Sequence, residues 1–253
     1  MKKKAIVLGA GPAGLVTAWK LLEQNWDVQI IEKQPIVGGM CRSWKWDDFI
    51  LDTGPHIFHT PEKDLARFWK KEFKNNLIEG TFWCKNVRGK NFNEYWDYPI
   101  SLESIKKYPF KIKEKINKEL KNLKKEDKSR ATNFKDYMEA QVGQTLTNLF
   151  FTKYPEKIWG IETKEMTPNW APKRLELRKN ITPFYYKQYC AVGKYGTGSI
   201  YEIIKKKIIK LNGKFNFKTT ITGFDFENLY INQIKIDKKS NIKINKDDVV
   251  IST

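Results

Sequence analysis

Histidine, cysteine and long apolar runs are scarce in this chain, and each scarcity excludes a class of protein. The 253 residues include two histidines and three cysteines. The cysteines, Cys41, Cys84 and Cys190, are odd in number and widely spaced, which excludes a disulfide framework and zinc-ligand spacing and favours a reducing compartment. No apolar run is long enough to cross a bilayer. The first residues resemble a signal peptide, but they lack a small-residue cleavage site, so we expect a cytoplasmic protein. Because zinc-ligand spacing is absent, we also expect no metal site.

Acidic residues are also few, with 29 Asp and Glu against 47 Lys and Arg and a formal net charge of +18. Such a balance raises nucleic acid, a membrane surface or an anionic substrate as partners. The densest basic stretch, residues 106–130, has an apolar stripe at helical spacing: Ile112, Ile116, Leu120 and Leu123. It predicts a helix with a solvated lysine face, and a membrane-surface contact is the alternative. No RNA-binding signature accompanies the charge, so we expect no nucleic acid partner.

Glycine, in contrast, is concentrated in the first sixty residues. Gly9, Gly11 and Gly14 follow a short apolar run and open a segment of helical composition. A second apolar run then ends at Glu32. Strand, glycine turn, helix and strand in this order predict a βαβ unit that binds a dinucleotide.

Each position in this unit has a predicted task. Gly9 permits a tight turn, Gly11 lets the backbone approach a pyrophosphate, and Gly14 lets the helix pack against the strand. The helix N-terminus offers its free N–H groups to the phosphates. Glu32 is expected to accept hydrogen bonds from the adenosine ribose, which disfavours NADP, and the adjacent Lys33 is a further cofactor-binding candidate.

The residues after Glu32 resemble the second glycine motif of the flavin-dependent amine oxidase superfamily. In that superfamily, the residues matching Gly38 and Gly39 run beside the FAD pyrophosphate, and the arginine matching Arg42 approaches the flavin. Residues 215–221 resemble the strand whose backbone recognises the adenine of FAD, with Thr220 or Ile221 nearest. The resemblance therefore implies FAD as the cofactor.

Both histidines fall in the sequence Gly-Pro-His-Ile-Phe-His-Thr, at residues 54–60. We expect His56 near the isoalloxazine, with His59 as the less favoured position; neutral imidazole donates a hydrogen bond or moves a proton there. The segment closely resembles the matching stretch of the UDP-galactopyranose mutase family, whose members use reduced FAD as a nucleophile to interconvert ring forms of a nucleotide sugar.

Two further stretches, residues 153–160 and 173–178, resemble the same family. The resemblance implies that Tyr154 and Trp159 line the substrate cleft and that Arg178 pairs with the substrate pyrophosphate, a task suited to a planar guanidinium. A buried tryptophan and a surface arginine are the structural alternatives.

Other residues depart from the mutase pattern. Residues 192–201, with Gly196 and Gly198, resemble the glycine turn of protoporphyrinogen oxidase-like flavoenzymes, and residues 170–174 also differ. The first hypothesis is therefore an FAD-dependent oxidoreductase that transfers a hydride from substrate to flavin. The second is a mutase-like enzyme that isomerises an anionic nucleotide sugar for cell-surface polysaccharide.

The predicted fold is α/β: a Rossmann-type FAD-binding domain of the GR2-like kind with an inserted, mainly helical substrate domain. We expect the FAD-binding βαβ part at 1–80, the inserted region at 81–190 and a return to the FAD-binding domain at 191–253. Helices are predicted at 61–73, capped by Thr60, and at 199–211, and strands at 214–226 and 229–244.

The last residues, 247–253, read as a buried strand. The resemblance implies that a C-terminal FAD segment should follow, so we expect an N-terminal fragment. A third hypothesis is thus a truncated nucleotide-binding protein that depends on a second chain.

Overall fold

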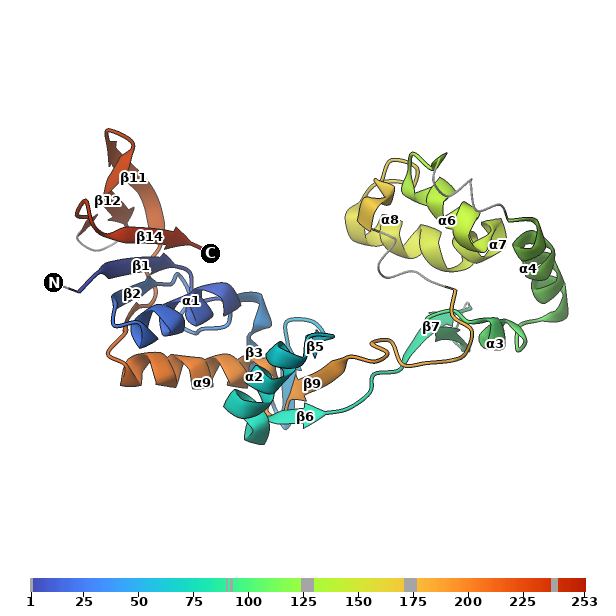
Figure 1. Cartoon of the computed structure of the whole chain (residues 1–253), viewed down its shortest axis with the longest axis horizontal. Coiled ribbons are helices and arrows are strands. Elements are labelled where there is room, and N and C mark those ends of the chain that lie inside the picture. Colours follow the sequence, from blue (N-terminus) through green and yellow to red (C-terminus); the bar gives the residue numbers. More distant parts are fainter. Residues whose placement is uncertain (1, 90, 92, 124–129, 171–176, 238–240) are drawn as a thin grey trace. The chain divides into compact units, whose positions relative to one another are not determined.

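The computed structural model describes residues 2–89, 91, 93–123, 130–170, 177–237 and 241–253. The chain divides into two compact units (Figure 1). Unit 1 consists of Met1–Gly80 and Gln188–Thr253, and unit 2 consists of Thr81–Lys187.

The central sheet of unit 1 is parallel, with strand order β10-β2-β1-β14. Its strands are β1 (Lys4–Leu8), β2 (Asp27–Ile31), β10 (Lys214–Asn216) and β14 (Val249–Ser252). The strand order reverses direction at β1, because β2 and β10 extend the sheet on one side and β14 on the other. Ligands of such sheets bind beyond the carboxyl ends of the strands at this switch point, where the glycine turn after β1 lies.

Both faces of this sheet are covered, which explains why its two inner strands are mainly apolar, with Lys4, Asp27 and Gln29 only partly buried. Along β1, Ala5 and Val7 belong to one buried cluster, while Ile6 and Leu8 belong to another. The first cluster includes two helices, and the second includes the antiparallel sheet β11-β12-β13. Successive side chains of a strand point to opposite faces, so a run of four apolar residues fills both layers.

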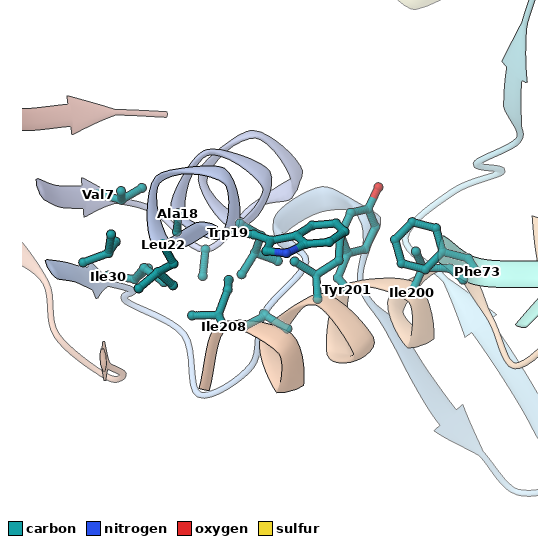
Figure 2. Packing of buried hydrophobic residues seen from close by; sticks show 14 of the residues in the cluster. Val7, Ala18, Trp19, Leu22, Ile30, Phe73, Ile200, Tyr201 and Ile208 are labelled. Atoms are coloured by element: carbon teal, nitrogen blue, oxygen red, sulfur yellow. The ribbon is translucent and has the colours of Figure 1, made fainter. Parts of the chain in front are cut away.

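Helices α1 (Pro12–Glu23) and α9 (Thr197–Lys210) supply the helical layer (Figure 2). The buried residues of α1 recur at helical spacing: Leu15, Ala18, Trp19 and Leu22. Those of α9 recur in the same way and include Ile200, Tyr201, Ile204 and Ile208. The two stripes meet in one cluster against the sheet, and this packing fixes α1 relative to α9.

Besides the two sheets and two helices described above, the described residues of unit 1 contain two small sheets, one further α-helix and two short 3-10 helices. Strands β5, β9 and β6 form one antiparallel sheet, and β3 and β4 form a hairpin. The N–H of Gly80 donates to the carbonyl of Cys190 at 3.2 Å, so the chain leaves for unit 2 and returns from it at neighbouring points. The remaining elements of unit 1 are η1 (Gly39–Cys41), β3 (Ser43–Trp46), β4 (Phe49–Asp52), β5 (Phe58–Thr60), α2 (Lys63–Phe73), η2 (Lys74–Asn76), β6 (Leu77–Glu79), β9 (Tyr189–Gly193), β11 (Ile221–Glu227), β12 (Tyr230–Ile236) and β13 (Ile242–Lys243).

Unit 2 is mainly helical and has its own core. Its elements are β7 (Cys84–Arg88), β8 (Glu94–Tyr98), α3 (Leu102–Ile105), α4 (Phe110–Asn122), α6 (Phe134–Val142), α7 (Gln144–Leu146), the π-helical η3 (Thr147–Thr152), α8 (Lys153–Trp159) and η4 (Pro168–Trp170). Strands β7 and β8 form a hairpin. Its Trp96 ring lies 4.5 Å from that of Tyr108 and 5.9 Å from that of Phe150, between centroids. The hairpin is therefore joined to the helices by aromatic packing.

Four sequence predictions need correction. The helix predicted at 61–73 begins at Lys63, because Thr60 belongs to β5 and its hydroxyl instead accepts the N–H of Glu62. The prediction of one strand at 214–226 and one at 229–244 is wrong in number, because each range contains two strands: β10 and β11 in different sheets, and β12 and β13 in the same sheet. Strand β14 forms, but it is half-exposed at the sheet edge rather than buried.

The fourth correction concerns the basic helix. Helix α4 begins only after Pro109, which takes the N-cap position, and ends at Asn122. Ile116 is fully buried, and Ile112 and Leu120 pack beside it as the spacing predicts. Residues 124–129 of the predicted helix lie outside the described residues.

Candidate functional site

The glycine turn after β1 has the backbone geometry that a phosphate-binding turn requires. Gly9 has φ of 108°, a conformation that L side chains rarely adopt. A Cβ at Gly14 would overlap the Gly9 carbonyl oxygen, so α1 approaches the turn as closely as glycine allows. A Cβ at Gly11 would meet no atom within 4 Å. The space in front of Gly11 is therefore open at the N-terminus of a twelve-residue helix.

The second glycine motif lies against the first. The N–H of Gly38 donates to the carbonyl of Ala10 at 2.8 Å. A Cβ at Gly39 would lie 3.1 Å from the Cα of Gly11, and Gly39 has φ of 53°. Two motifs that are nearly thirty residues apart in the sequence thus line one backbone cradle. Such a cradle of glycines fits the pyrophosphate of a dinucleotide, so the residues present fit the predicted cofactor.

Glu32 is buried at the end of β2, and backbone groups already hold it. Its Oε2 accepts the N–H of Ala10 at 2.7 Å, and its Oε1 accepts the N–H of Gln34 at 2.7 Å. Each carboxylate oxygen has a further lone pair for a ribose hydroxyl. The carboxylate therefore fixes the glycine turn directly, a task that the sequence interpretation missed, while Lys33 is exposed beside it.

The adenine-recognition prediction falls on a bend between sheets. The N–H of Thr219 donates to the Glu32 carbonyl at 3.1 Å, and Thr219 is buried. Thr220 instead donates its N–H to Asp237, and Ile221 begins β11. Of the predicted segment, Thr219 therefore lies next to the end of β2, and the assignment of Thr220 and Ile221 stays a prediction.

The two histidines are held by different partners. The Nε2 of His56 lies 2.8 Å from the Met40 carbonyl oxygen, in the loop of the second glycine motif. The Nδ1 of His59 lies 3.0 Å from the side-chain oxygen of Gln188. The structure therefore brings His56, and not His59, to the loop that follows Gly38 and Gly39.

The loop with His56 is also attached to the N-terminus of α9. The Asp52 carboxylate accepts the Thr197 N–H at 3.1 Å and 3.2 Å and the Thr197 hydroxyl at 2.6 Å. Ser43 donates its hydroxyl to Asp52 and accepts the Gly198 N–H at 2.7 Å. Asp52 and Ser43 thus cap α9 from the β3–β4 hairpin. Arg42, directly before Ser43, is half-buried and accepts the N–H of Thr53 at its carbonyl at 3.3 Å.

This cap gives the glycine turn before α9 a structural task. A Cβ at Gly196 or at Gly198 would overlap Ser43. Both glycines therefore let the hairpin approach the helix closely. The feature that the sequence associated with oxidase-type flavoenzymes has a packing explanation in this structure.

In unit 2, the ionisation of Tyr98 is coupled electrostatically to two of the predicted site residues. Burial raises the pKa of Tyr98 to about 12, the charges of Tyr154 and Cys84 act in the same direction, and Arg178 opposes them. Tyr98 is thus a neutral hydrogen-bonding phenol at physiological pH. Its electrostatic coupling to Tyr154 and Arg178 makes it an additional candidate for this region.

Arg178 is half-buried, and the loop that follows it takes part of its hydrogen-bonding capacity. One guanidinium nitrogen donates to the Thr182 hydroxyl and the Pro183 carbonyl, each at 2.7 Å, and the other donates to the Phe184 carbonyl at 3.0 Å. The guanidinium is therefore held in a fixed direction by its own loop. Lys173 and Arg174, the other basic residues of this stretch, lie outside the described residues.

Helix α8 carries the other two candidates. Tyr154 is 67% exposed and Trp159 is 63% exposed. The alternative of a buried tryptophan is therefore wrong. An exposed indole and an exposed phenol on one helix are available to a ligand, and their role stays a prediction.

Residues 7–71 match the model of the NAD(P)-binding Rossmann-like domain. The chain is 31% identical over 193 residues to the dTDP-fucopyranose mutase of Escherichia coli, covering 72% of this chain and 48% of the mutase. It superposes on a crystal structure of reduced UDP-galactopyranose mutase with a TM-score of 0.78 and 21% identity, over 100% of this chain and 55% of that one. This chain is a homologue of dTDP-fucopyranose mutase and UDP-galactopyranose mutase.

The likeness to these mutases extends through both units, because the superposition covers the whole chain. The chain is also 30% identical over 118 residues to the L-amino-acid oxidase of Crotalus adamanteus, covering 44% of this chain and 22% of the oxidase. The chain thus has a Rossmann-type domain and is similar in sequence both to a sugar mutase and to an oxidase. The chain spans about half the length of the curated mutases that it matches.

No helix among the described residues is long and apolar enough to cross a membrane. The same residues contain no group of three histidine, cysteine or carboxylate side chains that could hold a metal ion.

Asp52, Ser43, Thr197 and Tyr98 are site residues that sequence reasoning missed. Asp52 and Thr197 are separated by 145 positions, so no spacing pattern connects them. Asp52 does directly precede the Thr-Gly-Pro-His sequence, and this was the available signal.

Proposed function

We propose that this protein is an FAD-dependent enzyme that isomerises a sugar attached to a nucleoside diphosphate. The observation that carries the proposal is the convergence of the two glycine motifs and His56 on the switch-point end of the parallel sheet. The homology to two sugar mutases supports the reaction class.

In this proposal, unit 1 holds the cofactor. Gly11 and Gly39 line the pyrophosphate cradle, the N-terminus of α1 faces it, and Glu32 and Lys33 lie toward the adenosine end. Bound FAD would supply the electron-rich or electron-accepting ring that no side chain of this protein can replace. The chain positions that ring through Gly38, Gly39 and Arg42, and His56 holds or moves a proton beside it.

Unit 2 recognises the substrate in the same proposal. Arg178 donates to an anionic phosphate, because its loop already fixes the direction of the guanidinium. Tyr154 and Trp159 offer exposed aromatic surfaces to the nucleoside or the sugar. The excess of basic residues favours an anionic substrate.

The test is ring-form interconversion of UDP- and dTDP-linked hexoses, followed by chromatography, with FAD added and dithionite present or absent. We expect interconversion only under reduction. R178A should raise KM at least about tenfold, since a charged hydrogen-bonding partner is lost. Lys179→Ala, the adjacent exposed position, is the matched control. FAD binding without any interconversion of either sugar nucleotide would reject the mutase assignment.

An FAD-dependent oxidoreductase is the second candidate, and the similarity to an amino-acid oxidase favours it. It predicts that an organic substrate bleaches the oxidised flavin without dithionite. Bleaching by an amine or an amino acid, with no effect of sugar nucleotides on the flavin spectrum, would select this candidate instead.

A further inference from the structure

The residues 53–59, here called the histidine loop, connect two parts of unit 1. Asp52 precedes the loop and caps α9, and His56 within it contacts the Met40 carbonyl. The loop is therefore fixed at one end to a helix and at its centre to the second glycine motif.

The Met40 contact determines which ring nitrogen carries the proton. A backbone carbonyl only accepts hydrogen bonds, so the Nε2 that lies 2.8 Å from it must be the donor. In neutral imidazole the other nitrogen, Nδ1, then has no proton and is an acceptor. His56 thus presents a proton acceptor, and not a donor, at Nδ1.

The Thr197 hydroxyl ties Asp52, the residue directly before the histidine loop, to the N-terminus of α9. Its oxygen lies 2.6 Å from the Asp52 carboxylate and 3.4 Å from the His56 carbonyl oxygen. The hydroxyl has one proton, and the shorter distance assigns it to Asp52. Thr197 is 1% exposed, so no bulk water competes for this proton.

Asp52 accepts more donors than an amide could satisfy. Its two oxygens accept the Thr197 N–H, the Thr197 hydroxyl and the Ser43 hydroxyl. An asparagine would direct an NH₂ group at one of these donors and release the Thr197 proton toward the His56 carbonyl. The carboxylate therefore fixes the start of the histidine loop to α9 and the β3–β4 hairpin, although it does not contact the imidazole in the structure.

We propose that Asp52 is a positioning residue for His56: together with Thr197 and the Met40 carbonyl, it holds the imidazole in one orientation with the proton on Nε2 and with Nδ1 as the acceptor. The consequence for catalysis rests on the proposed function, in which Nδ1 takes a proton beside the flavin. The orientation itself is a property of the protein without any ligand.

Histidine-selective ¹⁵N labelling tests the orientation directly, because the chain contains two histidines and H59Q assigns the remaining ring. Spectra are recorded above the pH range in which imidazole is protonated. We expect a pyrrole-type signal from Nε2 of His56 and a pyridine-type signal from Nδ1. In the wild-type protein, a proton on Nδ1 or the averaged signals of a freely rotating ring would by itself overturn the proposal.

Variants then test the role of the cap. We expect T197V and D52N to move both ring signals of His56 toward averaged values, and T197S, which keeps the hydroxyl, to retain the wild-type signals. D64N, at an exposed carboxylate paired with Arg67, is the matched control. If D52N fails to fold, the comparison of T197V with T197S decides. Wild-type ring signals in folded T197V would reject the role of the cap.

Activity separates this inference from the proposed function. With FAD and substrate, we expect T197V to lower kcat about tenfold and to leave KM unchanged, because orientation and not binding is lost. Fixed ring signals without FAD binding would reject the proposed function and keep the orientation. FAD binding and turnover with a mobile ring would reject the fixed orientation and keep the proposed function.

Discussion

The two units of this chain depend on different kinds of residue. In unit 1, the critical positions around the cradle are glycines, where backbone meets backbone and any side chain would intrude. In unit 2, the critical positions are large aromatic residues, whose rings fill the space between a hairpin and the helices. The cradle of unit 1 is therefore specified by positions where side chains are absent, and the junction of hairpin and helices in unit 2 by how large side chains pack.

Phe150→Ala should have the largest effect, and it should be confined to unit 2. Phe150 is 4% exposed and its ring neighbours those of Trp96, Tyr98 and Tyr108. Removing it leaves a cavity that costs about 3–5 kcal/mol of unfolding free energy. Urea unfolding with limited proteolysis measures it, and Phe226→Ala at an exposed ring of unit 1 is the control. If Phe150→Ala lost protection against proteolysis equally in both units, this would contradict the independence of the two cores.

Gly14→Ala should destabilise unit 1 by about 2–4 kcal/mol, because the new methyl group overlaps the Gly9 carbonyl oxygen and forces α1 away from the turn. Thermal unfolding measures the loss. Gly11→Ala is the matched control: its methyl group meets no protein atom, so stability should stay within about 0.5 kcal/mol while FAD affinity falls. Equal losses of stability in Gly14→Ala and Gly11→Ala would contradict the role assigned to the close contact between Gly14 and the Gly9 carbonyl oxygen.

Glu32→Gln should cost about 2 kcal/mol, since the amide leaves one of the two backbone N–H groups of Ala10 and Gln34 without its acceptor. The expected loss is seen in urea unfolding without nucleotide. Glu23→Gln, at an exposed ion pair with Lys20, should change stability by less than about 0.5 kcal/mol. Equal effects at the two positions would show that the Glu32 carboxylate does not support the glycine turn.

Tyr98→Phe should have the smallest effect at neutral pH, and a measurable one only in alkali. The pKa of Tyr98 is raised to about 12, whereas an unfolded tyrosine ionises near 10. The stabilisation from this group is therefore complete below about pH 10 and is lost as the pH rises toward 12, by at most about 2.7 kcal/mol. Tyr98→Phe should reduce the slope between these pH values, measured by urea unfolding, and Tyr95→Phe at an exposed position should not. An unchanged slope in Tyr98→Phe would place the alkaline sensitivity elsewhere, for example at Tyr189, whose pKa is also raised to about 12.

Sequence reasoning succeeded where a physical constraint leaves a local signature. A βαβ unit was predicted because two of its constraints, the positive φ of Gly9 and the close approach of Gly14 to the Gly9 carbonyl oxygen, arise within a few residues of the chain. Most elements followed from apolar spacing, as Ile116 in α4 shows. Thr60 misled the prediction of α2, because the same residue type suits a helix cap and a strand, and tertiary pairing in β5 decided.

The rest depended on contacts between distant residues. Nothing in the sequence around Thr197 indicates that its hydroxyl meets Asp52, and nothing around Arg178 indicates that its own loop accepts its hydrogen bonds. The bend after β10 was missed for the same reason, since β11 pairs with β12 in another sheet. Side-chain hydrogen bonds and sheet membership are properties of the folded chain.

The hydrogen bond between Gly80 and Cys190 also bears on how such a protein could arise. Because strands β6 and β9 are already paired where the chain departs and returns, a short turn could join them and close unit 1 on itself. The 107 residues of Thr81–Lys187 thus enter at a hairpin-like junction, and their gain or exchange would leave the ladder beneath untouched. Under the proposed function, replacement of this one inserted segment would change the substrate without redesign of the part proposed to hold the cofactor.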